Sequence, residues 1–187
     1  LVSENAYLTE WPEAMVGDFP AEYLSLPEPV LVTAMAKHER FFPVRNKDGG
    51  LSNRFVSIRN GGDPSAVLRG NQWVLNARFS DAKFFFEDDL LKTMDDFLAK
   101  TGNMSFAEGL GSIRQRADRL AELSREVALA AGASQELAEL ANRAGLYAKA
   151  DLSSGLVSEM ASLQGIIGGD YAKREGFEEG VCEAIRF

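Results

Sequence analysis

Seven of the basic side chains between positions 37 and 69 form the clearest group of residues with a common chemistry. Region 30–83 holds nine Lys or Arg against four Asp or Glu, whereas the 187-residue chain carries a net charge of −8. Guanidinium groups bind phosphate bidentately, and spaced basic groups bind a nucleic-acid backbone. The alternative is a solvated basic face that compensates the acidic remainder. The candidate RNA-binding residues are Lys37, His38, Arg40, Arg45, Arg54, Arg59 and Arg69.

Catalytic and metal-binding chemistry has weaker support, and we expect no catalytic residue and no metal ligand in this chain. His38 and Cys182 are the only residues of their types and lie far apart, which argues against a Cys–His nucleophile or an ordinary zinc site. Asp151 and Glu159 have no histidine companion, so we interpret them as members of surface or interhelical ion pairs. Neither a GxxxxGK[ST] nor a GxGxxG phosphate loop occurs.

The composition is that of a globular protein, with 45% apolar and 26% charged residues. No apolar run approaches the roughly 18 to 20 residues of a membrane span, and the start lacks the basic and apolar regions of a signal peptide. A single cysteine fits a reducing compartment, so we expect a cytoplasmic protein without a membrane partner. The chain has no initiator methionine and stops within a helical pattern, which indicates a fragment of a longer protein.

The first expected region, 1–103, combines helices with a β-hairpin and carries the basic face. Asp48-Gly49 supplies the positive φ of a hairpin turn between two alternating strands. Asp63-Pro64 is typical of a helix start, and Trp73, Phe79 and the run 84–86 are expected in the core. Acidic residues 87–89 are interpreted as a solvated face or as partners of arginine. The expected elements are a short helix at 1–11, a turn at 16–20, helical turns at 21–26, and helices at 29–39, 64–91 and 93–99.

The second expected region, 104–187, is a helical bundle that follows a glycine-rich linker at 106–112. Ser112 and Ser134 are predicted N-caps of helices that end near Ala131 and Leu152. Gly168 and Gly169 are expected to loosen the bundle. The fold class is therefore mainly α with a β-hairpin (α+β), with long helices. Residues expected to face the bundle interior are Ile113, Leu120, Leu123, Val127, Ala128, Leu137, Leu140, Ala141, Ala144, Ala148 and Leu152.

Several motifs together resemble the β subunit of the bacterial two-subunit glycyl-tRNA synthetase. They occur in the order typical of that family and cover nearly the whole chain. Two places depart from the expected pattern, Gly61-Gly62 after Asn60 and the stretch 158–162, which is less acidic and aromatic than expected. The motifs are LTEWP at 8–12, PVLVTAMAKHERFFPV at 29–44, GNQWVLNARFSDAKFFF at 70–86, LGS at 110–112, AKADL at 148–152 and LQGIIG at 163–168.

The resemblance implies a subunit several times longer than this chain, in an enzyme that attaches glycine to tRNA(Gly). The partner α subunit would activate glycine with ATP and Mg²⁺, the β subunit would bind tRNA, and the two would form an α2β2 tetramer. The resemblance also implies a bundle akin to HD-type hydrolases. Asp151 has no histidine companion there, so we expect a scaffold whose metal site is lost. Two alternatives stay open: an HD-like metal-dependent phosphohydrolase, and a helical protein-interaction module without a nucleic-acid role.

Overall fold

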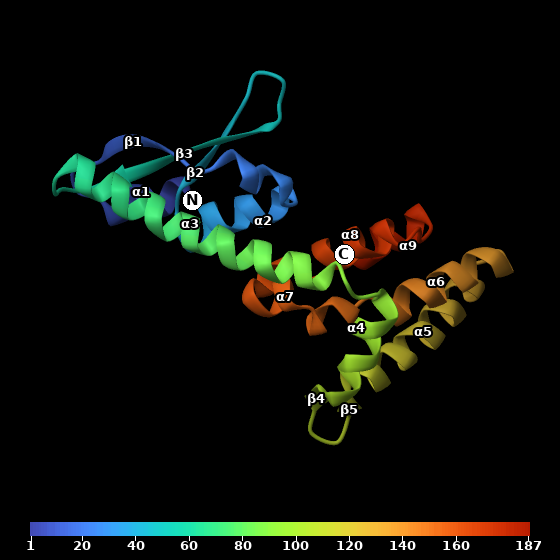
Figure 1. The fold of residues 1–187 in the computed structure, drawn as a ribbon. Helices are drawn as coiled ribbons and strands as arrows, with labels where there is room; N and C mark the ends of the chain where they lie inside the picture. Colours follow the sequence, from blue (N-terminus) through green and yellow to red (C-terminus); the bar gives the residue numbers. More distant parts are fainter. The chain divides into compact units, whose positions relative to one another are not determined.

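A computed structural model describes all residues, 1–187, and shows two compact units. Unit 1 is Leu1–Phe86 and unit 2 is Glu87–Phe187. Nine α-helices and a small antiparallel sheet confirm the predicted class, mainly α with a β-hairpin (Figure 1). The division into compact units does not test the domain boundary predicted at 103/104, which stays a prediction. None of the helices combines the length and the apolar character that a membrane span requires.

Unit 1 is built on a three-stranded antiparallel sheet whose strand order is β1-β3-β2. The predicted hairpin of β2 and β3 is confirmed, and Gly49 in its turn has φ of 90°. The prediction of a turn at 16–20 is wrong for residues 16–18, because they belong to β1. This strand pairs with β3 from Glu13–Arg59 to Asp18–Arg54. The strands are β1 (Glu13–Asp18), β2 (Phe42–Arg45) and β3 (Leu51–Arg59).

Gly17 is required by the packing of the sheet. It lies opposite Phe55, whose side chain is fully buried and stacks on Phe41 with ring centroids 4.7 Å apart. A Cβ at position 17 would lie 2.3 Å from Cζ of Phe55. Gly17 lies within the expected turn at 16–20, but it makes room for an aromatic ring within a strand.

We expect Gly17→Ala to destabilise unit 1 by roughly 1 to 3 kcal/mol, the usual cost of overpacking a core. Both tryptophans, Trp11 and Trp73, lie in unit 1, so tryptophan fluorescence during urea unfolding reports this unit. Gly70→Ala is the matched control, because a Cβ there meets no atom within 4 Å. An unfolding midpoint of Gly17→Ala equal to that of the wild-type protein would show that the Phe55 ring has room to move.

The long helix of unit 1, α3 (Pro64–Asp89), buries a narrow stripe of its surface. Leu75 and Phe79 of the long helix α3 are fully buried, and Phe79 contacts Phe19 edge to face, with ring centroids 4.9 Å apart. Asp63 caps α3 as predicted, because its Oδ1 accepts a hydrogen bond from the Ala66 N–H. The helical segments are α1 (Val2–Leu8), the 3-10 helix η1 (Ala21–Ser25), α2 (Glu28–Thr33), the π-helix η2 (Ala34–His38) and α3 (Pro64–Asp89).

Two expectations for the core of α3 are wrong. The side chain of Trp73 is 74% exposed and that of Phe84 is 66% exposed. Successive helical residues are 100° apart, so the run 84–86 cannot turn three rings toward one layer. Trp73 precedes the buried Leu75 by two residues and therefore lies on the other side of the helix.

Unit 2 is helical, and its two longest helices, α5 and α6, begin at the predicted caps. The hydroxyl groups of Ser112 and Ser134 accept hydrogen bonds from the N–H groups of Gln115 and Leu137, each at 3.2 Å. The helices are α4 (Met94–Lys100), α5 (Ile113–Ala130), α6 (Gln135–Tyr147), α7 (Gly155–Glu159), α8 (Ile166–Arg174) and α9 (Glu179–Arg186). Shorter segments are η3 (Thr101–Asn103), β4 (Ser105–Ala107), β5 (Gly111–Ser112), η4 (Ala150–Ser153) and η5 (Ala161–Leu163).

Small residues, not the large apolar ones, form much of the contact between α5 and α6. A Cβ on Gly145 would lie 2.7 Å from the carbonyl oxygen of Leu120, so the two backbones approach closely. The expectation that Leu123, Val127 and Leu137 face inward is wrong, since each is more than half exposed. The positions of large apolar residues therefore predict the wrong buried face for these helices, because alanine and glycine make the contacts. The buried small residues of these helices are Ala117, Ala121, Ala138 and Ala144.

Two further expectations for unit 2 are wrong. The stretch expected as a linker at 106–112 contains a short antiparallel pair, β4 with β5. Gly168 and Gly169 lie inside α8 and are buried. A Cβ on Gly168 would lie 2.9 Å from Oδ2 of Asp151, so this glycine permits a close contact and does not loosen the bundle.

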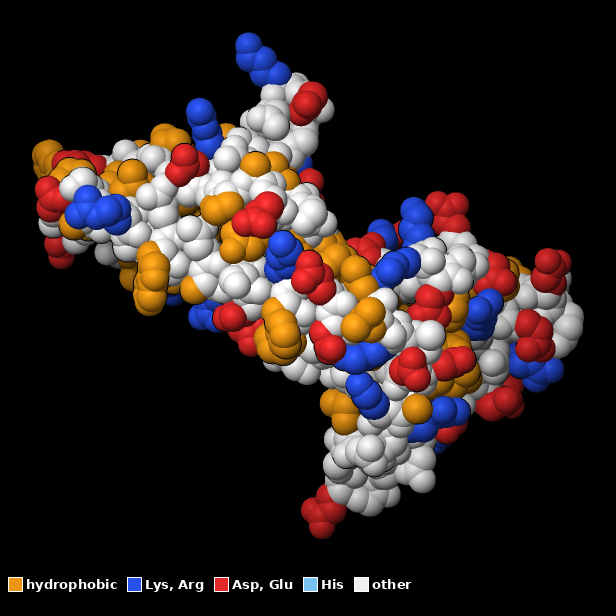
Figure 2. All heavy atoms as spheres, in the orientation of Figure 1, with side chains coloured by type: hydrophobic (Ala, Val, Ile, Leu, Met, Phe, Trp, Pro, Cys, Tyr) orange, Lys and Arg blue, Asp and Glu red, His pale blue; other side chains and the backbone are white.

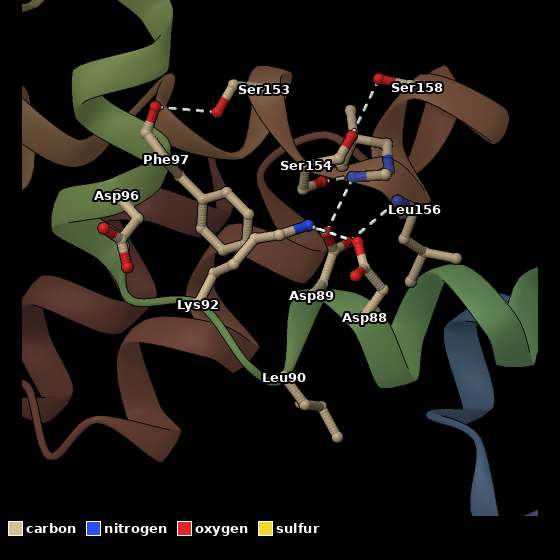
Figure 3. A network of polar contacts seen from close by, with 12 residues as sticks. Asp88, Asp89, Leu90, Lys92, Asp96, Phe97, Ser153, Ser154, Leu156 and Ser158 are labelled. Atoms are coloured by element: carbon tan, nitrogen blue, oxygen red, sulfur yellow. Dashed lines mark hydrogen bonds and ion pairs between the residues drawn. The ribbon is translucent and has the colours of Figure 1, made fainter.

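Asp89 and Asp151 are fully buried, which overturns their assignment to a solvated face and to an ion pair. Asp89 accepts hydrogen bonds from the N–H groups of Gly155 and Leu156, both at 2.9 Å (Figure 3). It also accepts one from the hydroxyl of Tyr171. These N–H groups begin α7 and have no partner within that helix, so Asp89 acts as its cap from a distant part of the sequence.

Asp151 performs the same task for α8. Its Oδ2 accepts from the N–H groups of Gly165 at 2.6 Å and Gly168 at 3.1 Å. Burial raises the pKa of Asp151, and the two backbone hydrogen bonds oppose that shift. Its other oxygen, Oδ1, is buried without a hydrogen-bond partner.

Candidate nucleic-acid interface

All seven predicted RNA-binding residues lie in unit 1, on three kinds of element. Lys37 and His38 end the π-helix η2, and Arg40 lies two residues beyond its end. Arg45 ends β2, Arg54 and Arg59 lie on β3, and Arg69 lies on α3. On the face of the molecule shown in Figure 2, basic and acidic side chains are interspersed. The candidate interface is therefore best described by the ion pairs and surroundings of each residue.

Two of the seven residues, both of them arginines, pair with carboxylates of unit 1. Arg59 forms an ion pair with Glu13 and donates to the carbonyl oxygen of Gly62, and its side chain is only 12% exposed. Arg45 forms an ion pair with Glu28 and donates to the carbonyl oxygen of Gly49, but it stays exposed. Arg59 is thus committed to the fold, whereas Arg45 keeps part of its guanidinium at the surface.

The other five residues are exposed and form no ion pair. Glu39 and Asp18 are the nearest acidic candidates by sequence and strand register, and both are engaged elsewhere. Arg78 pairs with Glu39 at 3.5 Å, and Asp18 accepts a hydrogen bond from the side-chain amide of Gln72. The unpaired residues are Lys37, His38, Arg40, Arg54 and Arg69.

The hairpin brings Arg45 and Arg54 to one hollow of about 490 Å³, which we call the hairpin hollow. Lys47, which was not among the predicted residues, also lines it. No carboxylate lines this hollow, and the two side-chain amides can accept or donate hydrogen bonds. Lys47 was missed because its place in the turn gave it a structural explanation. The lining residues are Val44, Arg45, Asn46, Lys47, Ser52, Asn53 and Arg54.

The hairpin hollow can hold an anion, and its chemistry matches a phosphate backbone. The guanidinium of Arg54 and the ammonium of Lys47 supply unpaired charge, and Arg45, which pairs with Glu28, adds a second guanidinium. Such groups are usual at phosphate contacts. The structure does not place Lys37, His38, Arg40, Arg59 or Arg69 in this hollow. The predicted set is therefore divided into a hairpin group, a group at the end of η2, one arginine on α3 and one arginine held by Glu13.

No part of unit 1 or unit 2 gathers three or more His, Cys, Asp or Glu side chains that could hold a metal ion. Cys182 is buried, and burial raises the pKa of its thiol. Both acids that the bundle buries use their oxygens to cap helices. The exposed cations of unit 1 are the groups of this mainly α chain that could bind an anion.

Comparison with known proteins identifies the family of this chain. The model of the glycyl-tRNA synthetase beta subunit family matches residues 1–187. This chain belongs to that family, whose curated members are ligase subunits.

Three relatives, each called glycine–tRNA ligase beta subunit, show how far the similarity extends. The chain is 44% identical over 189 residues to the protein of Limosilactobacillus fermentum, and 40% identical over 187 residues to that of Desulfitobacterium hafniense. It is 41% identical over 188 residues to the protein of Streptococcus pyogenes. The matches cover 99 to 100% of this chain but only 27 to 28% of each relative.

Proposed function

We propose that this chain is the part of a glycine–tRNA ligase β subunit that binds tRNA(Gly) through the basic surface of unit 1. An α subunit would bind ATP and Mg²⁺ and activate glycine, and the two subunits would work as an α2β2 tetramer in the cytoplasm. Family membership supports the ligase role and the existence of an α partner. The observation that carries the RNA-binding role is the hairpin hollow, lined by Arg45, Lys47 and Arg54 without a carboxylate.

Two other functions are less well supported. An HD-like phosphohydrolase needs several metal ligands, and Oδ2 of Asp151 is already occupied by two backbone N–H groups. In a protein-interaction module without a nucleic-acid role, the exposed cations would be ordinary solvated surface charge. Such a module would also bind tRNA(Gly) weakly, so salt-dependent binding separates it from our proposal.

Two arginines of the same strand provide a matched test. In the complete β subunit with its α partner, we expect Arg54→Ala to weaken tRNA(Gly) binding roughly tenfold at low salt. It should also reduce the slope of log K against log salt by about 0.9, the contribution of one phosphate contact. Arg59→Ala removes the same charge from β3 but breaks the ion pair with Glu13, so it should mainly lower stability, by about 1 kcal/mol.

Fluorescence anisotropy with labelled tRNA(Gly), over a series of salt concentrations, gives both the affinity and the slope. Equal losses for the two variants would indicate a long-range effect of charge and would remove Arg54 from the interface. Salt-independent or undetectable binding by the wild-type enzyme would reject the RNA-binding role of unit 1 itself.

A further inference from the structure

Arg40 has a backbone conformation that arginine rarely adopts. Its φ is 57°, and it is the only residue other than glycine with a positive φ in the chain. In this left-handed region the Cβ of an L-residue crowds the following carbonyl, so glycine or asparagine normally occupies it. An outlier of this kind is kept only where its surroundings enforce it, and such outliers cluster at functional sites.

The surroundings of Arg40 enforce the conformation from both sides. The turn is wider than an α-helical ending, because Glu39 donates to Ala34 at 3.2 Å and Phe41 donates to Met35 at 2.7 Å. Phe41 is anchored by its ring stack on Phe55, and the side chain of Glu39 is held by Arg78. The chain must therefore reverse at position 40 whatever residue stands there, and glycine would do so with less strain.

The side chains of this turn give a reason for an arginine. Lys37, His38 and Arg40 are exposed and form no ion pair, and the only acid among residues 37–40, Glu39, is paired with Arg78. Three basic groups within four residues are thus exposed to solvent, and the one carboxylate beside them is already paired with Arg78. The turn leads into β2 through Phe41. The Cα atoms of Arg40 and of Arg45 in the hairpin hollow therefore lie at most about 17 Å apart.

We propose that the turn at 37–40 is a second phosphate-binding point for the tRNA backbone, and that position 40 keeps an arginine because its guanidinium binds a phosphate there. This inference rests on the proposed function. A spacing of up to about 17 Å is short compared with an RNA backbone, so one strand can reach both the turn and the hairpin hollow.

The decisive variant is Arg40→Gly, because it removes the guanidinium and relieves the backbone at once. In the complete α–β enzyme we expect it to bind tRNA(Gly) roughly tenfold more weakly at low salt, with a salt slope smaller by about 0.9. Hydrogen exchange of segment 34–45 without tRNA should be unchanged or slower than in the wild-type enzyme. Arg40→Lys should keep the salt slope, and Lys173→Ala, which removes an exposed charge of α8, should bind as the wild-type enzyme does.

Other results would overturn the inference. Wild-type affinity of Arg40→Gly, while the wild-type enzyme shows salt-dependent binding, would remove Arg40 from the interface and leave the proposed function intact. Weaker binding together with faster exchange of segment 34–45 would give Arg40 a structural role only. A loss of the same size in Lys173→Ala would indicate net charge rather than a contact. If the wild-type enzyme itself shows no salt-dependent binding, the proposed function fails, and this inference with it.

Discussion

Replacement of Asp151 by alanine is expected to lower the free energy of unfolding of unit 2 by about 2 to 4 kcal/mol. The change leaves the N–H groups of Gly165 and Gly168 buried without a partner, and each such group costs about 1 to 3 kcal/mol. Removing a buried carboxylate offsets part of this loss. The measurement is urea unfolding of the 187-residue chain followed by far-UV circular dichroism.

Asp151→Asn separates the charge from the hydrogen bonds. The amide oxygen can accept from both N–H groups, but the amide nitrogen would stand where Oδ1 now has no partner. We therefore expect a smaller loss, about 1 to 2 kcal/mol at neutral pH. An alanine variant as stable as the wild-type protein would show that water replaces the carboxylate at the start of α8.

The two variants should also differ in their dependence on pH. Burial raises the pKa of Asp151 above its unfolded value of about 3.9, so the folded state binds the proton more tightly. The wild-type protein should therefore gain stability relative to Asp151→Asn as the pH falls through the raised folded pKa. The gain should be complete below the unfolded pKa, because both states are then protonated.

Replacement of Asp89 by alanine is expected to destabilise unit 2 by about 3 to 4 kcal/mol, the larger of the two effects. Asp89 accepts three hydrogen bonds, two from the first turn of α7 and one from Tyr171. The ammonium of Lys92 lies 3.5 Å from its Oδ1 (Figure 3). All three donors would lose a buried partner, and hydrogen bonds to a charged group are worth more than neutral ones. Unfolding of the 187-residue chain measures the loss.

Tyr171→Phe is the matched partner of this variant, because it removes one donor and leaves the Asp89 contacts with α7 in place. We expect it to cost about 1 kcal/mol. The double variant Asp89→Ala/Tyr171→Phe should lose less stability than the sum of the two single losses, because both changes remove the same hydrogen bond. Strict additivity, or an Asp89→Ala variant of wild-type stability, would contradict the role of Asp89 as a cap.

The elements that local chemistry specifies could be predicted from the sequence. The hairpin turn at 46–50, the cap Asp63 and the caps Ser112 and Ser134 all depend on residues within four positions of each other. Strand β1 could not be predicted, because Gly17 is explained only by the ring of Phe55 on a partner strand. The buried roles of Asp89 and Asp151 depend in the same way on N–H groups 14 to 67 residues away.

The candidate site was predictable in its residue types but not in its grouping. The excess of basic residues in 30–83 correctly indicated exposed cations, and five of the seven are exposed and unpaired. Which arginine becomes locked depends on strand register, because β1 places Glu13 opposite Arg59. The left-handed conformation of Arg40 could not be predicted, because glycine is the residue that normally indicates a positive φ.

The caps of unit 2 set a limit on how far this protein can be shortened. Glu175 accepts a hydrogen bond from the N–H of Met94 at the start of α4, just as Asp89 does for α7 and Asp151 for α8. A chain severed at 103 would leave α7 without Asp89 and Glu175 without Met94. Helices of five to nine residues do not hold their shape alone in water. We therefore expect residues 87–103 and 150–175 to fold only together, although more than 40 residues separate them in the sequence.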